Sequence, residues 1–297
     1  MVCAVGRFRI LDERLEAVTS AWRLTKTFDF NGQRVAYEAF GDGSPVVLVH
    51  GTPFSSFVWR RIARELARSH LVFVFDLLGY GQSDKRRGQD VSLGVQNRVM
   101  AALLDHWGLR RPFVVAHDFG GATALRAHLL DGCDYEGLLL IDPVALRPWG
   151  SPFVQHVRAH EAAFAGVPDY IQRAILATYI QGAAFHPLRP DALEAYAAPW
   201  LGPTGQPAFY RQIAQMDPRY TDEIEGRYAE MRCPTRLLWG VEDQWVPVGR
   251  GRELGRRIPG CALTEVPDCG HLMQEDAPEA VVSAAFAFFD LTGAPAL

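Results

Sequence analysis

The sequence has no stretch that approaches the roughly 20 consecutive apolar residues of a membrane-spanning helix. Its first residues, MVCAVGRFRILDERLEAV, turn charged too soon for a secretory signal. Both absences favour a cytoplasmic protein that does not associate with a membrane.

Cysteine is also scarce, and the five cysteines show no CxxC or zinc-like spacing. The odd set of Cys3, Cys133, Cys233, Cys261 and Cys269 predicts free, reduced thiols, although a single disulfide would also fit. We find no motif for a metal or a cofactor and therefore predict neither.

An excess of charge of one sign is missing as well. The chain has 30 Lys and Arg against 34 Asp and Glu, a net charge of −4, and no long run of either sign. This balance disfavours nucleic acid and anionic membranes as partners. It suits a small, largely neutral organic substrate, and nothing in the sequence indicates an oligomeric state.

Apolar residues are abundant, at 48% of the chain, which is enough to bury a full core. An alternating segment at 26–40 with an Asn31-Gly32 turn predicts a hairpin, and an apolar run follows at 46–49. Uniformly apolar segments then alternate with helical ones, which predicts an α/β fold with a mostly parallel sheet and helices on both faces. The predicted strands are 71–76, 113–116, 137–142, 235–240 and 262–266, and the predicted helices include 59–70, 96–108 and 278–289.

The alternation lapses after residue 142, where helix-like segments follow one another without a buried strand between them. We therefore expect a helical cap inserted into the core, with the active site between cap and core at the carboxyl ends of the strands. Leu11 to Ser20 could form one helix, to which we give no catalytic role. The predicted division is an N-terminal extension (1–25), a core (26–142 and 230–297) and a cap (143–229).

The junction FVVA-HDFGG-ATALRAHLL places Asp118 at the centre of a small-x-nucleophile-x-Gly turn between a strand and a helix. The small residues Ala116, Gly120 and Gly121 let strand and helix approach closely. Asp is also a common N-cap, so this position alone leaves a catalytic and a capping role both open.

Three further segments complete a catalytic pattern. The loop His50 to Pro53 closes a buried strand and can supply an oxyanion donor, so the predicted donors are the backbone N–H groups of Thr52 and Phe119. Asp243 and His271 each follow a later predicted strand. This order predicts Asp118 as the nucleophile, His271 as the base and Asp243 as the acid that orients His271.

These motifs resemble the α/β-hydrolase superfamily over roughly residues 27–290. The resemblance rests on HGTPFSSFVWR, DLLGYGQSDK, AHDFGG, WGVEDQWVP and CGHLMQED. HDFGG is similar to the branch of epoxide hydrolases, haloalkane dehalogenases and fluoroacetate dehalogenases, whose nucleophile is Asp and whose site lies under a helical cap. No Ser stands in a G-x-S-x-G motif, which disfavours a serine esterase or lipase.

The resemblance implies an alkyl-enzyme ester, formed when ionised Asp118 attacks a carbon that bears a leaving group and hydrolysed by water that His271 activates. Some dehalogenases of the superfamily take the acid from the position of Asp142. Asp142 is therefore the alternative to Asp243, although it could instead cap the turn before Pro143.

The resemblance leaves the leaving group open. Haloalkane dehalogenases usually carry Trp, and many carry Asn, where this chain has Phe119 and Thr52. The Arg pair that fluoroacetate dehalogenases use for a carboxylate is missing. A dehalogenase would therefore need an unusual halide donor, such as Trp149.

Epoxide hydrolases are similar to this chain at the loop His50 to Pro53, and they use cap tyrosines to protonate the epoxide oxygen. The segment AFYRQI resembles their late cap segment, which makes Tyr210 one candidate and Tyr170 or Tyr179 the second. The sequence thus predicts an epoxide hydrolase-like enzyme. A haloalkane or haloacid dehalogenase and a non-catalytic ligand-binding protein of the same fold remain the alternatives.

Overall fold

The computed structural model describes residues 22–291. The predicted helix at 11–20, most of the predicted N-terminal extension and Cys3 lie outside this range. The cysteines inside it, Cys133, Cys233, Cys261 and Cys269, are free thiols.

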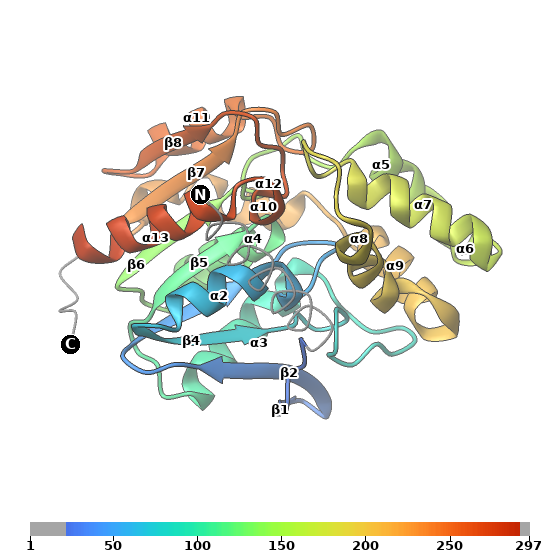
Figure 1. The fold of residues 1–297 in the computed structure, drawn as a ribbon, viewed down its shortest axis with the longest axis horizontal. Helices are drawn as coiled ribbons and strands as arrows, with labels where there is room; N and C mark the ends of the chain where they lie inside the picture. The colour runs from blue at the N-terminus through green and yellow to red at the C-terminus, as the bar shows by residue number, and fades with distance from the viewer. Residues whose placement is uncertain (1–21, 292–297) are drawn as a thin grey trace, which may run out of the picture.

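An eight-stranded sheet forms the centre of the molecule (Figure 1). Its strands are β1 (Lys26–Phe30), β2 (Gln33–Phe40), β3 (Ser44–Val49), β4 (His70–Phe75), β5 (Phe113–His117), β6 (Gly137–Ile141), β7 (Thr235–Gly240) and β8 (Ala262–Val266). They stand in the order β1-β2-β4-β3-β5-β6-β7-β8. Pairing is antiparallel between β1 and β2 and between β2 and β4, and parallel in the other pairs. The predicted α/β fold with a mostly parallel sheet is confirmed.

The hairpin of β1 and β2 turns at the predicted residues. Asn31 and Gly32 both have positive φ, 53° and 77°, as a two-residue turn between antiparallel strands requires. Asp29 accepts a hydrogen bond of 2.9 Å from the Gly32 N–H, which fixes the turn. This hairpin is the antiparallel edge of the sheet.

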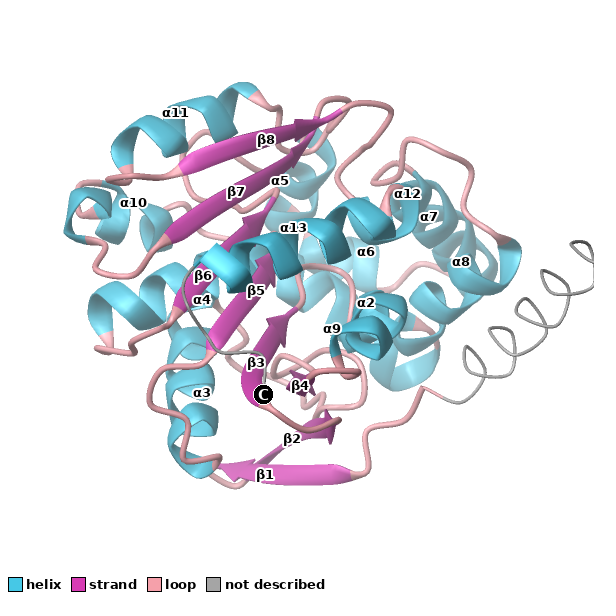
Figure 2. Cartoon of the chain, turned by 60° about the vertical axis from the view of Figure 1, so that its left-hand side comes forward, coloured by secondary structure: helices cyan, strands magenta, loops and turns pink. Residues whose placement is uncertain are grey.

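Helices cover both faces of the sheet. Outside the insertion they are η1 (Ser56–Trp59), α2 (Arg60–Leu66), α3 (Leu93–His106), α4 (Phe119–Leu130), α11 (Gly249–Arg257), α12 (Met273–Asp276) and α13 (Pro278–Leu291). Figure 2 shows α2 and α13 on one face, where they pack together, and α3 packed against α4 on the other. Because both faces are covered, β5 and β6 are buried along their whole length.

One predicted strand differs from the expectation. β8 lies at the edge of the sheet, and its Thr264 and Glu265 are exposed, so it is not covered on both faces as predicted. The order of strands places β8 at the edge, and its two polar residues, Thr264 and Glu265, are the ones that this position leaves exposed. Glu265 accepts two hydrogen bonds of 2.7 Å from Arg252 of α11.

The insertion between β6 and β7 contains helices and no strand in residues 142–234, all of which are described. Its elements are α5 (Pro152–Ala159), α6 (Glu161–Ala165), α7 (Asp169–Gln181), α8 (Pro190–Ala197), η2 (Ala198–Trp200), α9 (Gly202–Ala214), α10 (Arg219–Glu225) and η3 (Tyr228–Glu230). Figure 1 shows α5 to α9 gathered to one side of the sheet. In contrast, α10 packs against α4.

Candidate active site

Asp118 occupies a strained turn between β5 and α4. Its φ of 52° and ψ of −119° are unusual for a residue with a side chain and occur where a turn presents a functional group. Gly120 is required here, since a Cβ at that position would lie 2.4 Å from the carbonyl oxygen of Val49. The Asp118 side chain makes no capping hydrogen bond to α4, so the interpretation as a simple N-cap is wrong.

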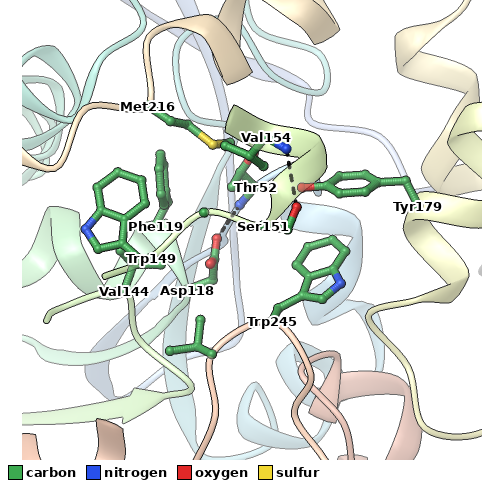
Figure 3. Close-up of a pocket in the computed structure, with 12 residues that line it drawn as sticks. Thr52, Asp118, Phe119, Val144, Trp149, Ser151, Val154, Tyr179, Met216 and Trp245 are labelled. Carbon is green, nitrogen blue, oxygen red and sulfur yellow. Dashed lines mark hydrogen bonds between the residues drawn. The ribbon is translucent and has the colours of Figure 1, made fainter. Parts of the chain in front are cut away.

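The carboxylate of Asp118 instead turns toward the loop that follows β3 (Figure 3). Its Oδ1 accepts a hydrogen bond of 2.7 Å from the Thr52 N–H, and the Phe119 N–H also stabilises the carboxylate. A Cβ at Gly51 would lie 2.4 Å from this Oδ1, so only glycine permits the close approach. Both predicted oxyanion donors therefore face the predicted nucleophile.

His50 holds that loop in place. Its Nε2 accepts a hydrogen bond of 2.9 Å from the Leu77 N–H, so its Nδ1 carries the proton and donates to the Gly51 carbonyl at 2.9 Å. Complete burial lowers the pKa of His50 and keeps the ring neutral, although nearby carboxylates oppose that shift. His50 thus positions Gly51 and Thr52 without a charge of its own.

His271 lies between two carboxylates. Its Nδ1 donates to Oδ2 of Asp243 at 2.7 Å. The other oxygen of Asp243 accepts from the N–H groups of Trp245 and Val246 at 2.7 and 2.8 Å, which fixes the carboxylate. On the far side of the ring, Nε2 lies 3.3 Å from Oδ2 of Asp118, in an alignment too poor for a hydrogen bond.

Charge shifts the pKa values of His271 and Asp118 in opposite directions. Burial opposes a charged His271, but the carboxylates of Asp243 and Asp118 outweigh it and raise the pKa of His271 well above its ordinary value. Burial likewise opposes ionisation of Asp118, and the facing His271 outweighs it, so the pKa of Asp118 is lowered. The arrangement is an ionised carboxylate beside an imidazolium.

Asp142, the alternative acid, lies nearby but has another partner. Its Oδ1 accepts a hydrogen bond of 2.8 Å from the Gly240 N–H, and among the described residues its Oδ2 has no partner. Burial, together with the charge of Asp243, raises the pKa of Asp142 well above its ordinary value. The structure thus pairs His271 with Asp243 rather than with Asp142.

Sequence reasoning missed His117, the neighbour of Asp118. Its Nε2 donates to the backbone carbonyl of His271 at 2.8 Å, and burial lowers its pKa to about 3. The neutral ring of His117 therefore connects the end of β5, through this hydrogen bond, to the loop that carries His271. The sequence did not indicate this contact, because His117 and His271 are 154 positions apart.

The loop of His271 is also hydrogen-bonded to the residues that follow α7. The Leu272 N–H donates to the Ala183 carbonyl at 2.7 Å. The Asp276 carboxylate accepts from the N–H groups of Phe185 and His186 at 2.8 and 2.9 Å. Residues 183–186 and 270–276 therefore form one hydrogen-bonded unit.

A small chamber of about 40 Å³ opens above Asp118 (Figure 3). Its walls come from the residues that follow β3, β5, β6 and β7 and from the insertion, so it lies at the carboxyl ends of the parallel strands. The lining residues are Thr52, Asp118, Phe119, Val144, Trp149, Gly150, Ser151, Val154, Tyr179, Met216, Trp245 and Val246.

Tyr179 is the one candidate tyrosine that reaches this chamber. Figure 3 shows its ring extending from α7 with the hydroxyl pointing into the space above Asp118. The ring stacks on Trp245, with centroids 4.6 Å apart. Burial and the charge of Asp118 raise the pKa of Tyr179 well above its ordinary value, which keeps the hydroxyl protonated as a donor.

Three other expectations are corrected. Tyr170 is 72% exposed and does not line the chamber, because its side of α7 faces solvent. Tyr210 is buried with its hydroxyl donated to Gln172, and it does not line the chamber either. Trp149 does line the chamber, but its indole N–H points away from Asp118 and donates to Thr221 at 2.9 Å, so it cannot serve as a halide donor (Figure 3).

Gln212 of α9 joins the insertion to the oxyanion loop. Its Oε1 accepts from the Thr52 hydroxyl at 2.6 Å and from the Tyr80 hydroxyl at 3.0 Å. Sequence reasoning missed this contact, which spans 160 positions for Thr52. The effect is to hold the Thr52 side chain away from the backbone N–H that faces Asp118.

Two absences hold for residues 22–291. No group of three or more His, Cys, Asp or Glu side chains is arranged to hold a metal ion. No helix there combines the length and the apolar character that crossing a membrane requires.

The sequence of this chain matches a known family over most of its length. Residues 46–285 match the family described as "Alpha/beta hydrolase family". The chain belongs to the alpha/beta hydrolase family. Membership of this family and the enzymes among its relatives show that this alpha/beta hydrolase is an enzyme. Its fold is the one that the motifs predicted.

Three known proteins show how far this chain is similar to others in sequence and fold. An alpha/beta hydrolase fold protein from Burkholderia ambifaria is 56% identical and superposes with a TM-score of 0.87, covering 89% of this chain and 98% of that one. "Haloalkane dehalogenase 2" of Mycobacterium tuberculosis is 26% identical over 92% of this chain and 96% of its own length. The epoxide hydrolase CorEH, at 21% identity and a TM-score of 0.71 over 90% of this chain and 99% of its own, is similar in fold alone.

Proposed function

We propose that the protein hydrolyses an epoxide through an ester between the substrate and Asp118. The observation that carries the proposal is the unequal environment of the two Asp118 oxygens. Oδ1 is held by the Thr52 N–H, whereas Oδ2 lies 3.3 Å from Nε2 of His271, and the side chain lines the chamber. Oδ2 is therefore the oxygen that attacks.

In the first step Oδ2 attacks an epoxide carbon, and the carbon–oxygen bond of the ring breaks. Because the pKa of Asp118 is lowered, its carboxylate is ionised at neutral pH and needs no base. The electron pair moves to the ring oxygen, which takes a proton from the Tyr179 hydroxyl. The phenolate of Tyr179 then recovers a proton from solvent.

In the second step water attacks the carbonyl carbon of the Asp118 ester. Esterification removes the negative charge of Asp118, and with it one of the two charges that hold the proton on His271. The imidazole can then act as the base while Asp243 orients it. Oδ1 becomes the oxyanion of the tetrahedral intermediate, already within reach of the Thr52 N–H at 2.7 Å. When the intermediate collapses, the bond between the carbonyl carbon and Oδ2 breaks, and Oδ2 leaves as part of the diol with the proton that His271 took from water.

The donors around the chamber favour an epoxide over a carbon–halogen bond. Opening an epoxide generates an alkoxide that needs a proton, and Tyr179 offers one at the chamber wall. A departing halide needs N–H donors, but Trp149 donates to Thr221 and Phe119 has no side-chain donor. Dehalogenation remains the second candidate, supported by the 26% identity to a haloalkane dehalogenase over 92% of the chain.

Single turnover in ¹⁸O-water tests the ester. If Asp118 attacks carbon, the product of the first turnover carries the oxygen of Asp118 and stays unlabelled, and the peptide that contains Asp118 gains the label. His271→Gln should form the same ester and stop there, which intact mass shows as an adduct.

The substrate class is tested on the wild type by measuring diol formation from epoxides beside halide release from haloalkanes and haloacetates. Halide release without diol formation would support dehalogenation, the second candidate, in place of epoxide hydrolysis. Labelled product in the first turnover, with no adduct on His271→Gln, would show that Asp118 is not the nucleophile.

A further inference from the structure

A second and much larger hollow lies on the outside of the insertion. It has a volume of about 540 Å³, within the range of roughly 300 to 1,000 Å³ typical of ligand pockets. We define it as the outer groove, lined by Ser151, Phe153, Ile171, Ala174, Ile175, Thr178, Tyr179, Gly182 and Trp245. Tyr179 is the only titratable residue among them.

The outer groove runs along α7, which carries apolar residues on two sides. Leu176 and Ile180 are buried within the protein. Ile171, Ala174, Ile175 and Thr178 are spaced at i, i+3, i+4 and i+7, so they form a second stripe on one side of the helix. This second stripe is open to solvent over most of its length, with Ala174 and Thr178 exposed.

The outer groove adjoins the catalytic chamber. Ser151, Tyr179 and Trp245 line both spaces, so these three side chains form the partition between them. Tyr179 and Trp245 stack on each other within that partition. A molecule that lies in the groove is therefore separated from the chamber of Asp118 by a single layer of side chains.

The two volumes differ by more than tenfold, about 40 against 540 Å³. A water molecule needs roughly 10 to 15 Å³ of such space, so the chamber holds only a few non-hydrogen atoms. That is room for a reactive ring and little else. Any larger part of the substrate has to lie outside the partition.

We propose that the outer groove binds an uncharged hydrocarbon tail of the substrate, whose reactive carbon sits at one end of the chain and reaches Asp118 past Tyr179 and Trp245. The inference rests on the proposed function for the reactive end. It adds the substrate class: terminal alkyl or arylalkyl epoxides in preference to small or charged ones. The lining supports this class, since it offers apolar surface and no charged side chain.

The test is a series of terminal 1,2-epoxides from four to twelve carbons, measured with the full-length enzyme. KM should fall by about two- to fourfold for each added methylene until the groove is filled, as expected for partial to full burial of a CH₂ group. The turnover number should change little, because the reactive end is the same throughout. A KM that is independent of chain length would overturn the inference.

A matched pair of variants tests whether the outer groove causes the dependence of KM on chain length. Ala174→Glu places a charge in the outer groove and should raise KM at least tenfold for the twelve-carbon epoxide while leaving the four-carbon one unchanged. Ala163→Glu makes the same change at an exposed position of α6 outside the groove and should behave like the wild type. Equal behaviour of the two variants would remove the groove from substrate binding.

Two controls separate the remaining explanations. A change in the solution mass of Ala174→Glu alone, seen by light scattering, would assign the groove to a second copy of the chain instead. If no epoxide is turned over, calorimetric titration with 1-butanol, 1-octanol and 1-dodecanol still tests the groove. Binding that strengthens with chain length and weakens in Ala174→Glu would uphold the tail site while the proposed function fails.

Discussion

The imidazole of His271 faces Asp243 and not Asp142, with Nδ1 and Oδ2 2.7 Å apart. Both acids follow neighbouring strands, β7 and β6, and both are buried. What separates them is their partners. The oxygens of Asp243 accept three hydrogen bonds, one of them from His271, whereas Asp142 accepts one from the Gly240 N–H.

This relationship predicts unequal effects of replacing the two acids. Asp243→Asn should reduce turnover by several orders of magnitude, since the comparable change in a serine-protease triad costs about 10⁴-fold. Asp142→Asn should be much milder, because its amide can still accept from Gly240. Steady-state kinetics of both variants decide the matter, and the opposite ranking would make Asp142 the acid.

The second prediction concerns the charge on His271. Because the carboxylates raise its pKa, His271 should remain protonated as the pH rises past its ordinary value of about 6.5. Asp118→Asn removes one of those charges, as the ester does, and should lower the pKa of His271. Titration of the ring Cε1–H signal by NMR measures both forms. An identical pKa in both would mean that esterification does not release the base.

The third prediction separates Tyr179 from Tyr210. Tyr179→Phe removes the hydroxyl at the chamber and should slow ester formation from an epoxide by about 10²-fold, within the range of general acid catalysis. Tyr210→Phe loses only its bond to Gln172 and should leave that step within about twofold of the wild-type rate. Rapid-quench measurement of the ester compares them. A larger loss in Tyr210→Phe would reinstate Tyr210 as the acid.

The fourth prediction concerns stability. Glu275 of α12 forms ion pairs with Arg60, 2.6 Å away, and with Arg61, and it also accepts from the Tyr196 hydroxyl of α8. Side chains of Glu275 and Arg60 are only 6% and 5% exposed. Glu275→Ala therefore leaves a buried, unpaired guanidinium and should lower the free energy of unfolding by about 3 to 5 kcal/mol.

The control for Glu275→Ala is a more exposed ion pair on α11. Glu253 pairs with Arg257, and both side chains are about one third exposed, at 33% and 36%. Glu253→Ala should lower the free energy of unfolding by only about 0 to 1 kcal/mol. Urea unfolding of both variants compares them, and a similar loss in the two would mean that burial adds nothing to the Glu275 contact.

Local chemistry made much of this fold predictable. The turn at Asn31 and Gly32 follows from two residues that tolerate positive φ, and both have it. The elbow at Asp118 follows from small residues flanking it, because Gly120 leaves no space for a Cβ against Val49. In each case the residues that determine the structure are a few positions apart.

Features that depend on distant segments were not predictable. α9 contains Pro207 in its interior, a residue that normally breaks a helix, yet it forms 13 residues of helix. The indole of Trp149 finds Thr221 72 positions away, so no local pattern shows that its N–H is occupied. Which tyrosine of α7 faces the chamber is likewise decided by how the helix packs.

The hydrogen bonds that join 183–186 to 270–276 also bear on how chimeras with related hydrolases would have to be joined. A crossover beyond His186 would separate Asp276 and Leu272 from the backbone groups they were selected with. A crossover at Gly182 keeps that unit intact and still exchanges α5 and α7, which carry most of the outer groove. The catalytic base and most of the outer groove thus lie on opposite sides of that junction, but Asp118 and Tyr179 lie on the same side as the groove. A chimera joined there therefore takes its nucleophile and its base from different parents, and its activity would report whether the two halves of the site are interchangeable.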